Sequence, residues 1–227
     1  SGNISQATQV VTLVDTTDPE IFAPSDIVAE ATNLSGTMIE LGEATAHDVM
    51  GIASITEHPP RFFVLGETTV TWTATDTSGN SASATQTVTV VDTTKPGLSI
   101  PHDQTIEASS LEGTLVEIGE AEAHDITGIS SIIHNTPDVF PLGSTMIAWT
   151  ATDNHGNSKT AYQTITVVDT TAPTIISPQD IVHEAIDPAL NYIAFDELSV
   201  VDNVGIESIT NDKPITFPFG STTVTWT

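Results

Sequence analysis

Residues 66–96 read GETTVTWTATDTSGNSASATQTVTVVDTTKP, and this stretch predicts two long β-strands joined by a tight turn. Every second residue from 69 to 75 is Thr, alternating with Val70, Trp72 and Ala74. A period of two is typical of a strand with one buried face. Residues 76–80, DTSGN, are typical of a turn, and the alternation then returns with Val88 and Val90 on one face. The sequence therefore predicts a β-hairpin.

The hairpin recurs at 143–173, and the chain repeats with a period of 77 residues. The tetrapeptide VDTT occurs at 14–17, 91–94 and 168–171, and Trp72, Trp149 and Trp226 keep the same spacing. A fixed period of this length predicts an array of similar small domains. We expect complete domains at 15–91 and 92–168, a third at 169–227 that lacks its last strand, and a spare last strand at 1–14.

Within one copy, the pattern predicts about seven short strands and no helix. An opening edge strand is expected at 19–31, where Pro24 is tolerated because an edge strand needs no donor at that position. Further strands are expected at 37–45 and 52–56, ahead of the hairpin. The predicted fold class is all-β, with tandem immunoglobulin-like β-sandwiches, and the three Trp residues are expected in the cores because they share the parity of their apolar neighbours.

The composition favours an extracellular protein that attracts cations. The 227 residues include 30 Asp and Glu but only 4 Lys and Arg, giving a formal charge of −26. This charge repels nucleic acids and anionic membrane surfaces. No apolar run approaches the ~20 residues of a membrane span, so no membrane insertion is expected. With no Cys, disulfides are excluded, and small β domains need another source of rigidity. Because the chain begins with Ser, we expect a mature or excised piece of a secreted protein.

The hairpin motif resembles the hyalin repeat (HYR) family. The shared pattern is G-x-T-T-V-T-W-T-A-T-D-x-x-G-N at 66–80, followed by D-x-x-x-P at 92–96, and the second copy keeps Trp149, A-T-D at 151–153 and G-N at 156–157. The resemblance implies immunoglobulin-like extracellular domains with adhesive or structural roles at cell surfaces and no catalytic residues. The extreme acidity and lack of Cys make the chain similar to prokaryotic, including archaeal, S-layer or surface-filament proteins.

Acidic and amide residues that recur at fixed places in the repeat are candidate metal ligands. In an immunoglobulin-like sandwich, Glu30, the linker residue Asp92, and the loop residues Asp125 and Asp153 are expected to converge on one junction. Several carboxylates with amide oxygens form a cage suited to Ca²⁺. The alternative is that they are solvated turn residues. The complete candidate set is Glu30, Glu107, Asp15, Asp92, Asp169, Asp48, Asp125, Asp202, Asp76, Asp153, Asn80 and Asn157.

Two His-Asp pairs, at 47–48 and 124–125, are candidates for a catalytic or a transition-metal site. No nucleophile recurs beside them, and the third copy has Val201 in place of the His. No pair of His residues has the i, i+4 spacing of a zinc motif. We therefore expect no enzyme activity.

The segment 1–14 and the incomplete third copy suggest how subunits assemble. Val11 and Leu13 occupy the inward positions of Val88 and Val90. We expect this strand to insert into the third copy of a neighbouring subunit, forming a head-to-tail filament. The alternatives are a window of a longer repeat protein, and an array of adhesive or carbohydrate-binding modules. Asn3 and Asn33 begin N-glycosylation sequons, and the expected partners are copies of the chain, cations and glycans.

Overall fold

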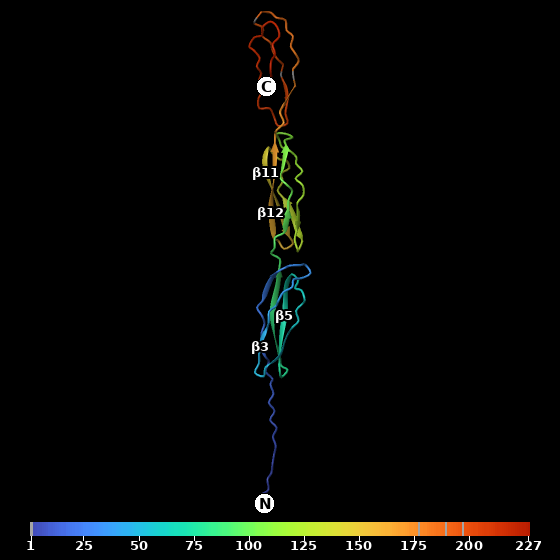
Figure 1. The fold of residues 1–227 in the computed structure, drawn as a ribbon, viewed down its shortest axis with the longest axis vertical. Helices are drawn as coiled ribbons and strands as arrows, with labels where there is room; N and C mark the ends of the chain where they lie inside the picture. The colour runs from blue at the N-terminus through green and yellow to red at the C-terminus, as the bar shows by residue number, and fades with distance from the viewer. Residues whose placement is uncertain (1, 177, 189, 197) are drawn as a thin grey trace. The chain divides into compact units, whose positions relative to one another are not determined.

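The computed structural model describes residues 2–176, 178–188, 190–196 and 198–227, and in these ranges it contains strands and no helix (Figure 1). Consequently, these ranges hold no helix that could cross a bilayer. Two successive copies show the same order of six strands, which confirms the predicted all-β fold of tandem immunoglobulin-like sandwiches.

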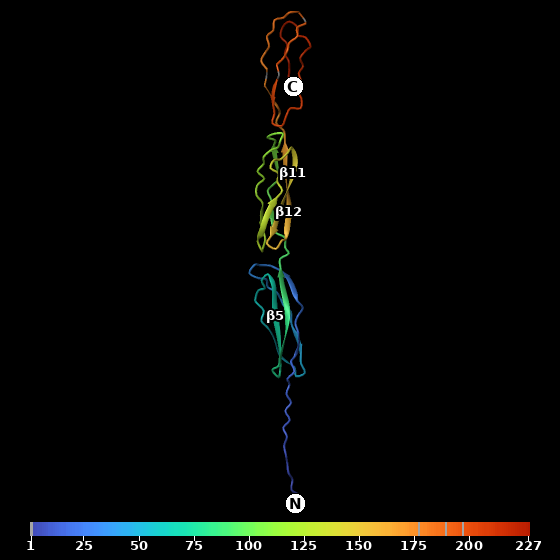
Figure 2. The same ribbon diagram turned by 180° about the vertical axis from the view of Figure 1, so that it is seen from behind.

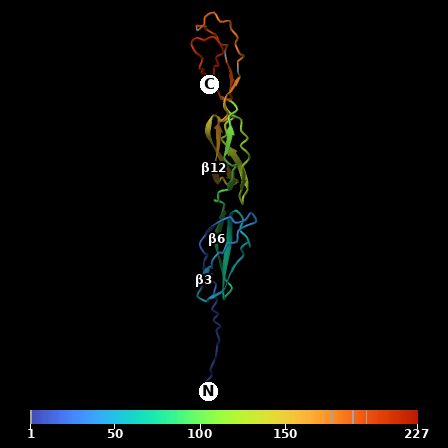
Figure 3. The same ribbon diagram turned by 45° about the horizontal axis from the view of Figure 1, so that its top comes forward.

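The first copy consists of a four-stranded sheet and a two-stranded sheet. The strands are β1 (Glu20–Phe22), β2 (Ile27–Glu30), β3 (Thr45–His47), β4 (Ile52–Glu57), β5 (Gly66–Asp76) and β6 (Ser81–Val91). The larger sheet has the order β2-β6-β5-β4, and the smaller one pairs β1 with β3. Figure 3 shows β3 and β6 of this copy. Strand β2 runs parallel to β6, whereas the other pairings are antiparallel.

The predicted hairpin is confirmed as β5 and β6. Its register runs from Gly66 opposite Val90 to Thr75 opposite Ser81. Gly79 occupies the turn with φ of +96°, a backbone conformation that residues with a Cβ rarely adopt. Outward-facing hydroxyls pair across the strands, as between Thr75 and Ser81 at 3.0 Å. Such cross-strand pairs support the ladder bonds of the hairpin.

The inward residues of this hairpin form the core of the first copy. Val70, Trp72, Val88 and Val90 are buried, and so is Phe63, which precedes β5. Gln86 has the same inward parity and is fully buried. Its Oε1 accepts a bond from Trp72 Nε1 at 3.2 Å, and its Nε2 donates to the carbonyls of Ser25 at 2.7 Å and Leu41 at 3.0 Å. The buried amide thus joins the core indole to two connecting segments.

The second copy repeats this arrangement with β7 (Gly97–Ser99), β8 (Gln104–Glu107), β9 (Glu122–His124), β10 (Ile129–His134), β11 (Gly143–Asp153) and β12 (Ser158–Val168). Figure 2 shows β11 and β12 from behind. Its sheets have the orders β10-β11-β12-β8 and β7-β9. Trp149 is buried and donates to Gln163 Oε1 at 3.1 Å, as its counterpart does in the first copy.

Two strand predictions differ from the structure. The expected strand at 19–31 is divided into β1 and β2, because the chain around Pro24 leaves one sheet for the other. Proline lacks the N–H that a continuous ladder would need. The expected strand at 37–45 is reduced to an isolated bridge between Thr37 and Phe63, and regular pairing begins only at Thr45.

The third copy has less regular structure than predicted. In the described residues it contains one strand pair, β13 (Thr174–Ile176) with β14 (Ser199–Val201), and isolated bridges from Asn191 to Phe217 and from Asn211 to Trp226. Trp226, expected in a core, is only half-buried and packs 5.9 Å from the Phe195 ring.

Candidate metal-binding clusters

The first acidic cluster consists of Asp15, Asp48 and Asp76, whose carboxylate oxygens lie within 4.8 Å of one another. Asp15 precedes β1, Asp48 follows β3, and Asp76 is the last residue of β5. Asp76 has the inward parity of Trp72, so the alternation that builds the core also buries this carboxylate at the end of the strand. Three distant parts of the first copy therefore bring their carboxylates together.

Hydrogen bonds keep the buried Asp76 ionised. Burial raises the pKa of Asp76, but bonds from Asn80, Ser78 and Gly79 outweigh this effect and lower it. The N–H groups of Ser78 and Asn80 both donate to Oδ1 at 2.8 Å. A carboxylate held in its charged form inside a turn is suited to binding a cation.

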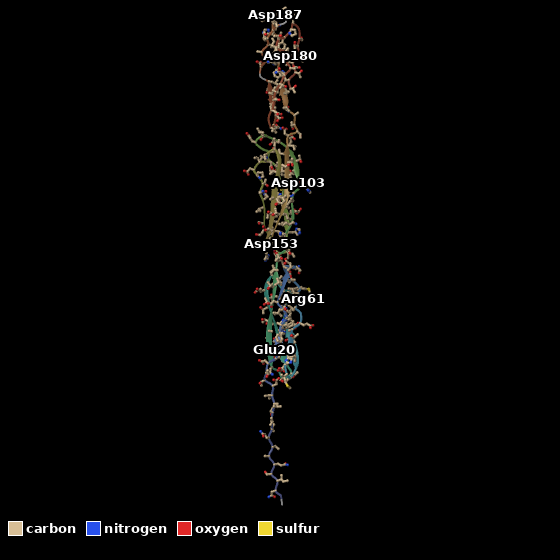
Figure 4. All side chains as sticks on the ribbon, turned by 90° about the vertical axis from the view of Figure 1, so that its left-hand side faces the viewer. Glu20, Arg61, Asp103, Asp153, Asp180 and Asp187 are labelled. Atoms are coloured by element: carbon tan, nitrogen blue, oxygen red, sulfur yellow. The ribbon has the colours of Figure 1, made fainter. Side chains whose placement is uncertain are left out.

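The second acidic cluster consists of Asp92, Asp125 and Asp153, again with oxygens within 4.8 Å of one another. Figure 4 labels Asp153, the last residue of β11. Burial raises the pKa of Asp153, and bonds from Asn157, His155 and Gly156 lower it by more. The side chain of Asp92 is only 4% exposed. The structure thus assembles the same three carboxylates in two copies, as the sequence predicted for Asp92, Asp125 and Asp153.

The two clusters differ at one oxygen. Asp92 Oδ2 accepts a bond from Thr127 Oγ1 at 2.6 Å and lies 3.4 Å from His155 Nδ1. In the first copy, Met50 and Ser78 occupy the equivalent positions. Asp15 Oδ2 is accordingly buried without a hydrogen-bond partner among the described residues. An unpaired buried carboxylate oxygen is costly, so the first cluster has the stronger need for an added ligand.

The donor set of both clusters fits Ca²⁺. Ca²⁺ binds carboxylate oxygens at about 2.3–2.6 Å, so oxygens on opposite sides of one ion lie roughly 4.6–5.2 Å apart. The carboxylate oxygens of each cluster all lie within 4.8 Å of one another, close enough to ligate one ion together. Across the described part of the chain, no Lys or Arg forms an ion pair with the six carboxylates. Their mutual repulsion is therefore left without a basic side chain to offset it.

Asn80 and Asn157, expected as oxygen ligands, use their amide nitrogens inside the protein. Asn80 Nδ2 donates to Asp76 Oδ2 at 2.7 Å and to the Asp15 carbonyl at 3.4 Å. Asn157 Nδ2 donates in the same way to Asp153 Oδ2 at 2.9 Å and to the Asp92 carbonyl at 3.1 Å. These amides orient the carboxylates and tie the hairpin turn to the segment that enters the copy.

Glu30 was expected beside Asp92. Its carboxylate instead accepts hydrogen bonds from Thr93 and Thr94, the two residues that follow Asp92. Its carboxylate accepts bonds from the N–H groups of Thr93 at 2.8 Å and Thr94 at 3.0 Å, and from their hydroxyls at 2.8 and 2.7 Å. It belongs to neither cluster in the described chain. We call Glu30 with Thr93 and Thr94 a Glu–Thr clamp. In the sequence, this Glu and the D-T-T tripeptide both recur every 77 residues, and this common spacing could have predicted the clamp.

Glu107 forms the equivalent clamp with Thr170 and Thr171. Bonds from the Thr171 hydroxyl, the Thr170 hydroxyl and the two N–H groups lower the pKa of Glu107 to about 2. The pKa of Asp202 is lowered by the N–H groups of Gly205 and Val204, while burial and the charge of Glu107 oppose this shift. Among described residues, Asp169 and Asp202 join no group of three carboxylates.

The low pKa of Glu107 predicts an acid-dependent loss of stability. Because folding lowers the pKa from 4.5 to about 2, the ionised clamp stabilises the second copy above pH 4.5, and this contribution is lost as the pH falls towards 2. Glu107→Gln should therefore lower the melting temperature at pH 6 and have little effect near pH 2. Glu117→Gln, at an exposed position whose side chain makes no hydrogen bond with the described residues, serves as the control. A difference between Glu107→Gln and wild type that is independent of pH would contradict the clamp.

These structural features define a repeat protein built from small immunoglobulin-like sandwiches with recurring acidic clusters. The model of the HYR domain family matches residues 14–90 and 91–167, so the chain belongs to the HYR domain family. This confirms the resemblance seen in the sequence and its 77-residue period.

Among characterised proteins, the chain is similar to hyalins of two sea urchins. It is 35% identical to hyalin of Strongylocentrotus purpuratus, over 99% of this chain and 20% of the hyalin. It is also 35% identical to hyalin of Lytechinus variegatus, over all of this chain and 47% of the hyalin. The third relative is a Rattus norvegicus protein, "Sushi, von Willebrand factor type A, EGF and pentraxin domain-containing protein 1", with 33% identity over 70% of this chain and 5% of that protein.

The chain spans less than half the length of each of these relatives. The relatives are animal proteins and do not support the prokaryotic origin expected from the composition. Acidity and a lack of Cys reflect the charge and the redox chemistry of a protein. Proteins of unrelated lineages can share both features, so they do not indicate the origin of the chain.

Proposed function

We propose that this chain is an extracellular, adhesion-related structural array whose sandwiches bind Ca²⁺ through the two acidic clusters. The observation that carries the proposal is the recurrence of three converging carboxylates in successive copies, with no basic side chain paired to them in the described residues except His155. The hyalin relatives and the HYR family support a structural role in place of an enzymatic one.

A bound cation would stabilise the first copy by joining segments that are far apart in sequence. Asp15, Asp48 and Asp76 belong to the entering segment, the loop after β3 and the end of β5. Without a cation, three negative charges lie close together and repel one another. When bound, Ca²⁺ supplies the positive charge that neutralises them, and the chain's own turns hold the oxygens in place.

We expect Ca²⁺ to raise the melting temperature of the first copy. At free Ca²⁺ about 100 times Kd, binding contributes about 2.7 kcal/mol, or roughly 10 °C or more for a domain of this size. Scanning calorimetry with Ca²⁺ or with a chelator measures the shift. Asp76→Asn, which removes one charge from the first cluster, should abolish the shift in that copy and leave the second copy's shift intact.

Glu57→Gln removes an exposed charge of β4 outside both clusters and serves as the matched control. It should leave the Ca²⁺-dependent shift unchanged. Identical wild-type melting curves with Ca²⁺ and with a chelator would overturn the metal proposal.

Self-assembly through the N-terminal segment is a second candidate function. Val11 and Leu13 are 75% and 93% exposed, whereas their counterparts Val88 and Val90 are 0% and 2% exposed in the first core. Two apolar side chains at core parity favour a partner that buries them, by strand addition to another sandwich. Sedimentation velocity of the purified chain tests this: concentration-dependent growth of oligomers supports head-to-tail pairing, and a monomer at all concentrations argues against it.

A further inference from the structure

A shallow groove of about 390 Å³ lies on the first copy, and no carboxylate of either acidic cluster lines it. It is lined by Thr32, Asn33, Ser35, Gly36, Met38 and Phe62. Phe62 stays 41% exposed although its neighbour Phe63 is buried. Gly36 has φ of +122° and lets its own segment approach the segment that contains Phe62. A Cβ at position 36 would lie 2.6 Å from Phe62 Cβ.

One residue that lines this groove, Asn33, begins a sequon, Asn33-Leu34-Ser35. The side-chain Oδ1 of Asn33 accepts a bond from the Ser35 N–H at 2.8 Å, which forms an Asx turn. Asn33 is exposed, and its Nδ2 makes no hydrogen bond in the described structure. The turn thus presents the nitrogen that N-glycosylation modifies, beside an apolar surface.

The second copy has neither the sequon nor the aromatic ring. Ser110 and Glu112 stand in place of Asn33 and Ser35, and Val139 stands in place of Phe62. The backbone is otherwise alike, because Gly113 also has a positive φ and packs against Val139. The exposed ring therefore occurs in the copy that also has an acceptor Asn, which favours a sugar as the group that covers it.

We propose that Asn33 carries an N-linked glycan whose first sugar packs on Phe62 and Met38. The apolar C–H face of a pyranose can lie on an aromatic ring, and the polar residues Thr32 and Ser35 line the same groove. The Arg61 guanidinium lies 5.4 Å from the centre of the Phe62 ring and helps to hold it in place.

The modification requires a lipid-linked oligosaccharide diphosphate as the glycosyl donor. A bond forms between Asn33 Nδ2 and the anomeric carbon of the sugar, and the bond from that carbon to the phosphate oxygen breaks. The lipid diphosphate leaves with the electron pair of the broken bond, and Nδ2 loses one proton. The amide nitrogen remains uncharged, so the glycan adds bulk and hydroxyls without changing the charge of the loop.

Secretion of the chain from a eukaryotic cell line, followed by glycopeptide mass spectrometry, tests the modification. We expect a glycan on Asn33 that is lost in Ser35→Ala, a variant that keeps the backbone N–H of the Asx turn. An unmodified Asn33 peptide from secreted wild-type protein would overturn the proposal.

The packing of the first sugar is tested by comparing the protein with one sugar left on Asn33 by an endoglycosidase and the protein produced in bacteria without any glycan. Bacterial production is used because peptide N-glycosidase converts Asn33 to Asp and so adds a charge. The one-sugar form should keep the melting temperature of the glycosylated protein, whereas the glycan-free form should melt at a lower temperature. Phe62→Val, which copies the second domain, should keep the glycan and lose this difference. Equal melting temperatures of the one-sugar and glycan-free forms, or a difference that survives in Phe62→Val, would overturn the packing.

Discussion

Trp72→Ala is expected to unfold the first copy at temperatures where the second copy remains folded. Trp72 belongs to the same buried core as Val70 and Val88, and its indole N–H donates to the buried Gln86. Truncation of a buried aromatic residue to Ala costs about 3–5 kcal/mol. Small domains have only about 5–15 kcal/mol of stability in total, so little stability should remain.

Differential scanning calorimetry and urea unfolding measure this effect. Trp149→Ala is the matched variant, because Trp149 makes the same contact with Gln163 in the second core. Each variant should move one unfolding transition and leave the other in place. If Trp72→Ala shifted both transitions equally, the two copies would not fold as separate cooperative units.

Gln163→Leu is expected to destabilise the second copy although it replaces a polar core residue with an apolar one of similar size. Gln163 is fully buried, and its Nε2 donates to the carbonyls of His102 at 2.8 Å and Ile118 at 3.1 Å. Leu would leave both carbonyls and the Trp149 N–H without partners. Each buried unsatisfied group costs about 1–3 kcal/mol, so we expect a loss of at least about 2 kcal/mol.

Chemical denaturation measures the difference in unfolding free energy between this variant and wild type. Gln104→Leu is the control in the same copy, because Gln104 makes one solvent-exposed bond, to the Glu117 carbonyl. It should change the stability by less than about 1 kcal/mol. Equal stability of Gln163→Leu and wild type would mean that water satisfies the abandoned carbonyls.

The alternation of side chains predicted the hairpin well because it is a local property of each strand. The same parity could have identified Gln86 and Asp76 as inward-facing polar residues, since each continues an apolar row. The division of the opening strand at Pro24 depends on which sheet each half joins, and this choice is made by distant partners. Sequence periodicity does not indicate which sheet each half of this strand joins.

The candidate site was predictable where turns and strand ends determine it. Asp48 and Asp76 follow or end strands at one end of the sandwich, so their meeting with Asp15 followed from the fold class. The position of Glu30 could not be predicted from the fold class, because either a cation or the nearby Thr donors could satisfy its carboxylate. In the structure, the Glu30 carboxylate accepts four hydrogen bonds from two consecutive Thr residues.

The parallel pairing of β2 with β6 has a mechanical consequence. Strand β6 leads directly to Asp92 and the next copy, and it is bonded to β5 over its length and to β2 over Ile27–Glu30. Tension on the chain beyond Val91 pulls β6 along its own axis, so the ladder bonds on both sides are loaded in shear and must break together. The Glu–Thr clamp adds four further bonds just beyond the end of that strand. The parallel pairing and the clamp therefore oppose stretching of the first copy along the direction of β6.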